Sequence, residues 1–229
     1  MKGKMIWILG GIVLIVLLIV CLVLPEKENK DENLLGIKYP EKGKTMSLSY
    51  DSDNPIVAMY VANYGSIVME LYPSVAPNTV NSFISLVKSG YYDNNTIHRI
   101  DPDFVLQGGD PTGTGSGGPG YTIKGEFSAN GFTNDLKHDK WVVSMGRQGN
   151  KYDSAGGQFF ICLKDSPILD GQYAAFGRVI DGFENIEKMV EEADIQNEVT
   201  GKLALNLTIK KTVIDLKGKK YPEPEVIKK

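Results

Sequence analysis

The stretch "HRIDPDFVLQGGD", residues 98–110, combines a strand-like pattern with residues that a plain buried strand does not contain. Apolar and polar residues alternate along it, but an arginine stands near its start, and a glutamine and two glycines stand near its end. Arginine occurs only at Arg99, Arg147 and Arg178 in this lysine-rich chain. A codon bias would also make arginine rare, but an arginine inside an ordered segment indicates a need for a planar, bidentate donor.

An uncharged apolar run of twenty residues, from Met5 to Leu24, lies near the N-terminus. As a helix it would measure about 30 Å, the thickness of the hydrocarbon core of a bilayer. Lys2 and Lys4 precede it, and positive flanks stay in the cytoplasm. We therefore expect a cytoplasmic N-terminus over residues 1–4, a transmembrane signal-anchor over residues 5–24, and the rest of the chain on the extracellular side of the cell membrane.

A cleaved signal peptide and a lipidated Cys21 are the alternatives to this anchor. The apolar run is longer than the roughly 7 to 15 residues usual in signal peptides, and no small-x-small cleavage site follows it. The "LIV" before Cys21 lacks the small residue that lipoprotein processing needs. These features favour an uncleaved anchor and leave both alternatives open.

Composition divides the rest of the chain into three parts. Residues 25–54 are rich in Lys, Glu, Asp and Asn and predict a juxtamembrane linker, residues 55–217 form the folded domain, and residues 218–229 form a C-terminal tail. Cys21 lies in the predicted span and Cys162 in an apolar run, so we expect no disulfide between them. The domain is nevertheless long enough to form one sizeable hydrophobic core. The formal charge of −3 gives no indication of nucleic-acid binding. We also expect the protein to be a monomer.

Many short strands and only two helices are expected within the domain. One helix is predicted by apolar residues at i, i+3, i+4 and i+7: Val80, Phe83, Ile84 and Val87. Asn78 is placed to cap its start and Gly90 its end, and a second helix is expected around residues 183–193. Many glycine-separated strands favour a closed barrel or a sandwich over an alternating α/β sheet.

Four sequence blocks occur in a specific order: "YGSIVMELYPSVAPNTVNSF" (64–83), "HRIDPDFVLQGGDPTGTGSGGPGYTIKGEF" (98–127), "VSMGRQGNKYDSAGGQFFIC" (143–162) and "LDGQYAAFGRVIDG" (169–182). Together they resemble the cyclophilins, a family of peptidyl-prolyl cis/trans isomerases, over residues 56–216. The resemblance implies a mainly β fold, a closed eight-stranded antiparallel β-barrel capped by two α-helices. It also implies proline-containing polypeptides as partners, and neither a metal nor another cofactor.

The resemblance assigns roles to individual residues. The arginine that acts on the prolyl amide corresponds to Arg99, and Phe104 and Gln107 complete the predicted catalytic set. The positions that correspond to substrate-binding residues are Val105, Gly115, Gly146, Arg147, Gln148, Gln158, Phe160, Leu169 and Tyr173.

Some positions differ from the better-known family members or have no assigned chemistry. Arg147 stands where those members have asparagine, which predicts a preference for acidic or carbonyl-rich partners, and Tyr173 stands where they often have histidine. We expect His98 to be structural and His138, within "LKHDKW", to lie on the surface. No Cys-His or His-His spacing indicates a metal site.

Side-chain alternation agrees with the assigned roles. Gln158 and Phe160 should face one side of a strand and Phe159 the other, so that one aromatic ring enters the core and the other walls an apolar pocket for proline. Arg99 provides a permanent charge on a planar donor, which favours the twisted amide if it is aimed at the prolyl nitrogen.

The sequence therefore predicts a membrane-anchored peptidyl-prolyl isomerase that acts on exported proteins as they fold. One alternative is a binding module or holdase that uses a proline pocket with little turnover. Another is a surface-tethered scaffold.

Overall fold

The computed structural model describes residues 48 and 50–228 of the chain. The predicted signal-anchor, residues 5–24, and most of the predicted linker lie outside the described residues. Within the described part, no helix is both long and apolar enough to cross a bilayer.

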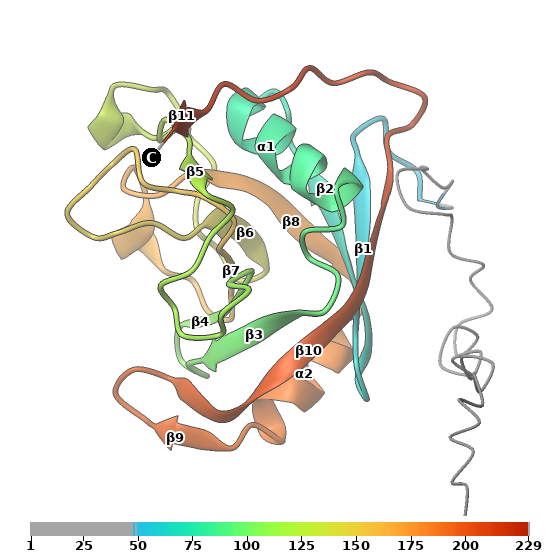
Figure 1. Ribbon diagram of the computed structural model, residues 1–229, viewed down its shortest axis with the longest axis vertical. Coiled ribbons are helices and arrows are strands. Elements are labelled where there is room, and N and C mark those ends of the chain that lie inside the picture. Colours follow the sequence, from blue (N-terminus) through green and yellow to red (C-terminus); the bar gives the residue numbers. More distant parts are fainter. Residues whose placement is uncertain (1–47, 49, 229) are drawn as a thin grey trace, which may run out of the picture. The chain divides into compact units, whose positions relative to one another are not determined.

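Eight strands close into one antiparallel barrel (Figure 1). In order around the ring they are β1 (Ile56–Val61), β2 (Gly65–Leu71), β8 (Ala175–Asp181), β6 (Val142–Met145), β7 (Phe159–Cys162), β4 (Val105–Gly108), β3 (Asn95–Ile100) and β10 (Lys202–Asp215). The ring closes where β10 pairs with β1, with Ile56 opposite Asp215 and Tyr60 opposite Lys211. The predicted eight-stranded barrel is confirmed.

Shorter elements lie outside this ring. β9 (Ile195–Asn197) pairs with the beginning of β10, and β5 (Tyr121–Thr122) pairs with β11 (Ile227–Lys228) in a separate two-stranded sheet. Two 3₁₀ turns, η2 (Ser128–Asn130) and η3 (Pro167–Leu169), belong to the connections. Because β11 lies near the end of the chain, part of the predicted C-terminal tail is ordered against the domain (Figure 1).

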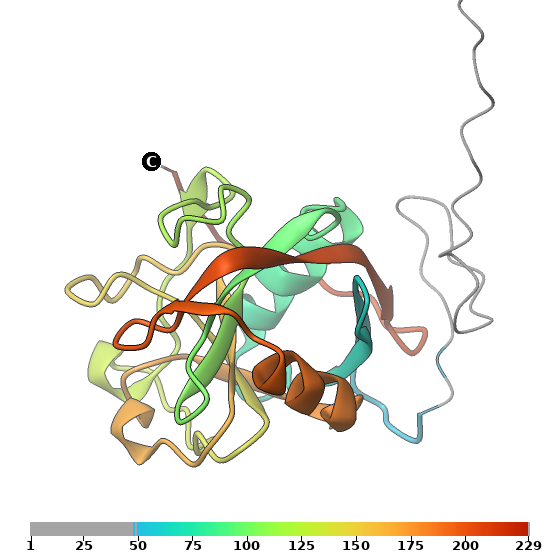
Figure 2. The same cartoon turned by 90° about the horizontal axis from the view of Figure 1, so that it is seen from below.

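The two helices, α1 (Pro77–Lys88) and α2 (Phe183–Glu191), lie at opposite ends of the barrel (Figures 1 and 2). The predicted cap at Asn78 is wrong, because helix α1 already includes that residue and Ala76 is its N-cap. The Glu126 carboxylate instead accepts hydrogen bonds from the Asn78 and Thr79 N–H groups at 3.0 and 2.7 Å. A distant acid thus satisfies two free amides and complements the positive end of the helix dipole.

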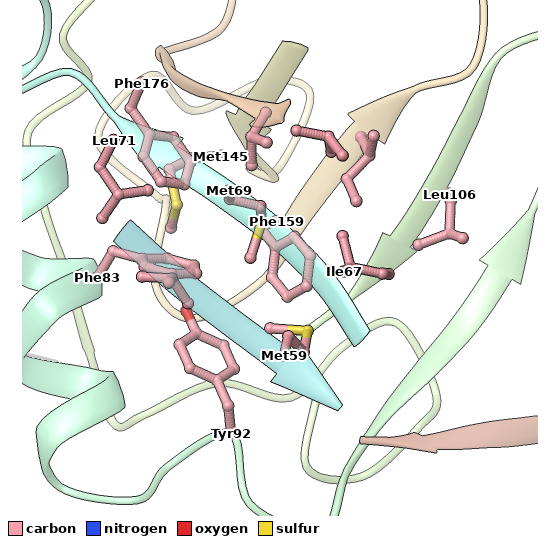
Figure 3. Packing of buried hydrophobic residues seen from close by; sticks show 14 of the residues in the cluster. Met59, Ile67, Met69, Leu71, Phe83, Tyr92, Leu106, Met145, Phe159 and Phe176 are labelled. Atoms are coloured by element: carbon pink, nitrogen blue, oxygen red, sulfur yellow. The ribbon is translucent and has the colours of Figure 1, made fainter. Parts of the chain in front are cut away.

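Aromatic and sulfur-containing side chains fill the inside of the barrel (Figure 3). Phe83 enters from α1, and its ring centroid lies 4.9 Å from Tyr92, 5.8 Å from Phe159 and 5.1 Å from Phe176. All four rings are fully buried. Phe83 belongs to the predicted apolar face of α1. The packing of its ring against these three aromatic side chains helps to hold the helix to the barrel.

Residues just before β1 contact the barrel, although their composition resembles that of a linker. The Leu48 N–H donates to Asp215 Oδ2 at 2.8 Å, and the Tyr50 hydroxyl donates to Asp181 Oδ2 at 2.5 Å. Both side chains pack against a small apolar cluster on the outside of β1, β2 and β10. Lys217 reinforces the contact, since its Nζ donates to the Leu48 and Tyr50 carbonyls at 2.8 and 2.9 Å.

We expect a chain that starts at residue 55 to be less stable than one that starts at residue 48. The loss of the Leu48 and Tyr50 contacts should lower the free energy of unfolding by about 2 kcal/mol. Urea denaturation of the two chains would measure the difference as a lower midpoint for the shorter chain. Equal midpoints would show that this segment contributes nothing to the barrel.

Candidate active site

A bulge in β3 places Arg99 directly opposite Gln107. Ile97 pairs with Gly108 and Arg99 with Gln107, so β3 has one residue more than β4 between these two pairs. An extra residue of this kind locally changes the direction in which the strand's side chains point. Ile97 and Ile100 therefore both reach the core, while Arg99 stays partly exposed beside Gln107.

The pairing continues across two more strands. Gln107 in β4 lies opposite Phe160 in β7, and Phe160 lies opposite Ser144 in β6. Directly opposite residues of antiparallel strands share a face of the sheet. We call Arg99, Gln107, Phe160 and Ser144 the cross-strand row. It lies outside the barrel core, whereas Phe159 points into the core, as the alternation predicted.

A chain of side-chain hydrogen bonds links Arg99 to the glycine-rich loop of residues 111–120. Arg99 Nη1 donates to Gln107 Oε1 at 3.3 Å, and Gln107 Nε2 donates to Gln158 Oε1 at 3.0 Å. Gln158 Nε2 then donates to the carbonyls of Gly115 and Gly117, at 3.0 and 2.9 Å. Each amide uses its oxygen on one side and its nitrogen on the other, so the two glutamines hold one another's orientation.

Other contacts set the direction of the Arg99 guanidinium. Its Nε donates to the Thr200 carbonyl at 2.7 Å, and its Nη2 lies 3.4 Å from Asp101 Oδ2. The Phe104 ring lies 5.5 Å from its Cζ, within the range of a cation–π contact. A guanidinium carries five N–H groups, and these contacts together with Gln107 engage three of them. The others can donate to a bound peptide.

Apolar residues, most of which the sequence predicts as walls of a proline pocket, adjoin the guanidinium, and we call this group the apolar pocket. It consists of a buried cluster and two partly buried aromatic residues that pack on it: Val105, Phe160, Cys162 and Leu169, with Phe104 and Tyr173. The rings of Phe160 and Tyr173 meet edge to face, with centroids 5.7 Å apart. Burial, followed by the nearby Asp170 charge, raises the pKa of the Cys162 thiol to about 12, so this buried thiol stays uncharged near neutral pH. An aromatic, uncharged surface of this kind suits a proline ring.

A polar pocket of about 230 Å³ is lined by Gln107 together with residues of the glycine-rich loop and of the segments around Gly146 and Gln158. Among the residues that line it are six of the predicted site residues: Gln107, Gly115, Gly146, Arg147, Gln148 and Gln158. The remaining predicted residues lie in the apolar pocket or at Arg99. The structure therefore brings all the predicted site residues together around the cross-strand row, while their individual roles stay predictions.

The two glycines that end the opening stretch are required by close backbone approaches. A Cβ at Gly108 would lie 2.9 Å from the Thr96 carbonyl oxygen. Gly109 has φ +88°, and a Cβ there would lie 2.3 Å from the Gly157 carbonyl oxygen. Only glycine combines this backbone conformation with this spacing, so "GG" lets the chain leave β4 close to its neighbours.

Asp110, the last residue of that stretch, anchors the glycine-rich loop. Its carboxylate accepts hydrogen bonds from the Thr112, Thr114, Gly115 and Gly117 N–H groups at 2.6 to 3.1 Å, and from the Thr112 hydroxyl at 2.8 Å. Burial by itself would raise the pKa of Asp110, but these hydrogen bonds outweigh burial and lower the pKa to about 2. The loop is therefore built around a carboxylate that stays ionised above that pH.

His138 is buried, and the prediction of a surface position is wrong. Its side chain is 1% exposed, and both ring nitrogens have partners: Nδ1 pairs with Asp170 Oδ1 at 3.1 Å and Nε2 with Ser144 Oγ at 3.0 Å. Burial lowers the pKa of His138, although Asp170 opposes this effect. The imidazole stacks on Phe160 with ring centroids 6.0 Å apart, so this hydrogen-bonded group supports the ring that walls the apolar pocket.

Sequence reasoning missed several supporting residues. Asp110 followed by Thr112 matches the pattern in which an aspartate side chain binds the backbone two residues later, and this signal could have found it. The pairing of His138 with Asp170 and Ser144 joins residues from different segments and has no local signal. The contact of Thr200 with Arg99 uses a backbone carbonyl, which any residue could provide.

Comparison with known proteins gives consistent results. A family model described as cyclophilin type peptidyl-prolyl cis-trans isomerase/CLD matches residues 56–214. The chain is 45% identical over 133 residues to peptidyl-prolyl cis-trans isomerase B of Bacillus subtilis. The aligned region covers 58% of this chain and 88% of that relative. It is 40% identical over 139 residues to the peptidyl-prolyl cis-trans isomerase of Helicobacter pylori, covering 60% of this chain and 81% of that protein.

A solved structure is also similar. It is a cyclophilin type peptidyl-prolyl cis-trans isomerase of Cryptosporidium parvum, crystallised in the presence of the dipeptide Ala-Pro. The TM-score is 0.61 and the sequence identity 34%, and the similarity covers 70% of this chain and 98% of the other.

We expect Asp110→Asn to destabilise the protein in a pH-dependent way. The folded pKa of about 2 lies below the ordinary value of 3.8, so the carboxylate stabilises the fold above pH 4 and loses this effect as the pH falls towards 2. Urea denaturation at pH 7 should show a loss of about 2 kcal/mol in the variant, shrinking towards pH 2. Asp103→Asn, at a carboxylate that is 82% exposed, is the matched control. A loss that does not vary with pH would contradict this account.

Proposed function

Since this chain belongs to the cyclophilin-type peptidyl-prolyl cis-trans isomerases, we propose that it accelerates X-Pro bond rotation in exported proteins while they fold. Uncatalysed rotation takes tens to hundreds of seconds, long enough to limit folding. Its clients would be proline-containing polypeptides that bind across the two pockets.

One observation carries the proposal: a fixed guanidinium with free donors adjoins an aromatic, uncharged surface of a kind that suits a proline ring. The Thr200 carbonyl and the Gln107 side chain hold Arg99, and Phe104 and Phe160 wall the pocket beside it. The arrangement can hold a prolyl ring in the pocket while a cationic donor faces the amide.

Little covalent chemistry is needed for this reaction. The barrier of about 18–20 kcal/mol arises from the double-bond character of the C–N bond. An N–H donated to the prolyl nitrogen stabilises the pyramidal nitrogen of the twisted state, and the planar amide gains less from it. Arg99 is oriented before a client arrives, so its hydrogen bonds need not reorganise during the rotation.

The cellular setting that we propose is the outer face of the cell membrane. The support is the apolar run of residues 5–24 with Lys2 and Lys4 before it. A single-pass anchor with its N-terminus in the cytoplasm would hold the isomerase domain where exported chains emerge and begin to fold.

We expect Arg99→Lys to lower kcat/KM for a proline peptide by at least about tenfold, because lysine keeps the charge but loses the planar donor group. Arg99→Ala should lower it by about a hundredfold or more. Peptide affinity should fall much less, since the aromatic pocket remains. A protease-coupled isomerisation assay and a peptide titration would measure the two effects, with Arg178→Ala as a control outside the site.

The holdase alternative makes the opposite prediction. If turnover survives Arg99→Ala while peptide binding collapses, Arg99 is a docking contact and the isomerase mechanism proposed here is wrong.

We expect protease added to intact cells to digest the domain, because the proposed anchor exposes it on the outer face. The full chain should also stay with membranes in high salt and be released by detergent. Immunoblotting of treated cells and of extracted membranes would follow both. Protection of the domain in intact cells, with digestion only after lysis, would contradict the proposed orientation.

A further inference from the structure

Three aromatic rings lie close to the guanidinium of Arg147. Its Cζ lies 4.5 Å from the centroid of Tyr173, 5.1 Å from Tyr152 and 5.4 Å from Phe127. Phe127 and Tyr152 also meet edge to face, with centroids 5.4 Å apart. Aromatic faces attract a cation at these distances, so the side chain is held against the rings.

The donors of Arg147 bind backbone carbonyls in two separate segments. Its Nε donates to the Gln172 carbonyl at 2.9 Å. Its Nη1 donates to the carbonyls of Gln148 and Gly149, at 3.0 and 2.9 Å. Within residues 48 and 50–228, no carboxylate forms an ion pair with it. The planar group therefore connects the loop after β6 to the segment between η3 and β8.

These two segments belong to different pockets. Tyr173 packs on Phe160 in the apolar pocket, and Gln148 lines the polar pocket. The Gln148 N–H also donates to Ser154 Oγ at 2.9 Å, which closes the loop of residues 148–154 on itself. Arg147 thus lines the polar pocket and also contacts Tyr173 of the apolar pocket.

We propose that Arg147 is a positioning residue that fixes Tyr173 and the loop of residues 148–154 relative to one another. Its role is to set the shape of the groove that receives the residues next to proline, and the inference rests on the isomerase function proposed above. It differs from the expectation raised by the sequence alone, in which Arg147 would select acidic or carbonyl-rich partners. Nε and Nη1 are already engaged with backbone carbonyls, and three rings lie within 5.4 Å of Cζ, so most contacts of the side chain are within the protein.

Lysine at this position separates the two hypotheses. It keeps the positive charge, but a single ammonium group at the end of a flexible chain cannot reproduce the planar arrangement of donors that reaches both segments. A positioning role should therefore be lost in Arg147→Lys and in Arg147→Ala alike. Charge selection should survive in Arg147→Lys and be lost only in Arg147→Ala.

The test measures kcat and KM of the full chain in detergent with three peptides, Ala-Xaa-Pro-Phe with Xaa as Ala, Glu or Lys. We expect both variants to raise KM about fivefold for all three peptides, with kcat changed less than about twofold. Arg178→Lys is the matched control, because Arg178 lies on β8 with one carbonyl contact, Nη2 to Lys140 at 3.1 Å. It should leave KM unchanged. A wild-type preference for the Glu peptide that Arg147→Lys retains and Arg147→Ala loses would overturn the proposal, as would unchanged KM in both variants.

A second measurement does not depend on turnover. Amide hydrogen exchange should become faster over residues 148–154 and 172–173 in Arg147→Lys, and stay unchanged there in Arg178→Lys. If the wild-type chain shows no turnover, the proposed function fails, and this comparison still tests whether Arg147 holds the two segments. Unchanged exchange in Arg147→Lys would overturn the inference even in an active enzyme.

Discussion

The antiparallel pairing of β10 with β1 closes the barrel, and the position of every site residue depends on it. A closed ring has no free edge, so each of its eight strands is held by a neighbour on both sides. Closure also divides every strand into side chains that face the core and side chains that face outward. β3, β4, β7 and β6 are consecutive in this ring, which allows residues far apart in sequence to form one cross-strand row.

Phe159 and Phe160 show what this division achieves. Phe159 packs against Phe83 and Tyr92 inside the barrel, where its contribution is to stability. Phe160, the next residue, walls a pocket on the outer face and is supported by His138 from behind and by Tyr173 at its edge. A rigid core and a preformed pocket are therefore opposite faces of the same strand, and movement of one would disturb the other.

The groups around the row share one property: each is held by several hydrogen bonds before a client binds. The Asp110 carboxylate holds the glycine-rich loop, the Thr200 carbonyl and Gln107 hold Arg99, and the carbonyls of two segments hold Arg147. Catalysis of a bond rotation requires little beyond oriented donors and an apolar surface, so most of the sequence specificity near the site serves to orient these groups.

Local patterns in the sequence determined the helices near residues 77–88 and 183–191, the short strands, and the opposite directions of Phe159 and Phe160, because these follow from periodicity along one segment. The motif order determined the family, and it predicted a set of site residues that the structure brings together. Tertiary structure alone decided that Glu126 caps α1, that His138 is buried against Asp170 and Ser144, and that Arg147 turns towards three aromatic rings. The contacts of Glu126 with Thr79, of His138 with Asp170 and of Arg147 with Tyr173 join segments distant in the chain, and the pairing of strands around the closed barrel, which no local pattern encodes, brings them within reach.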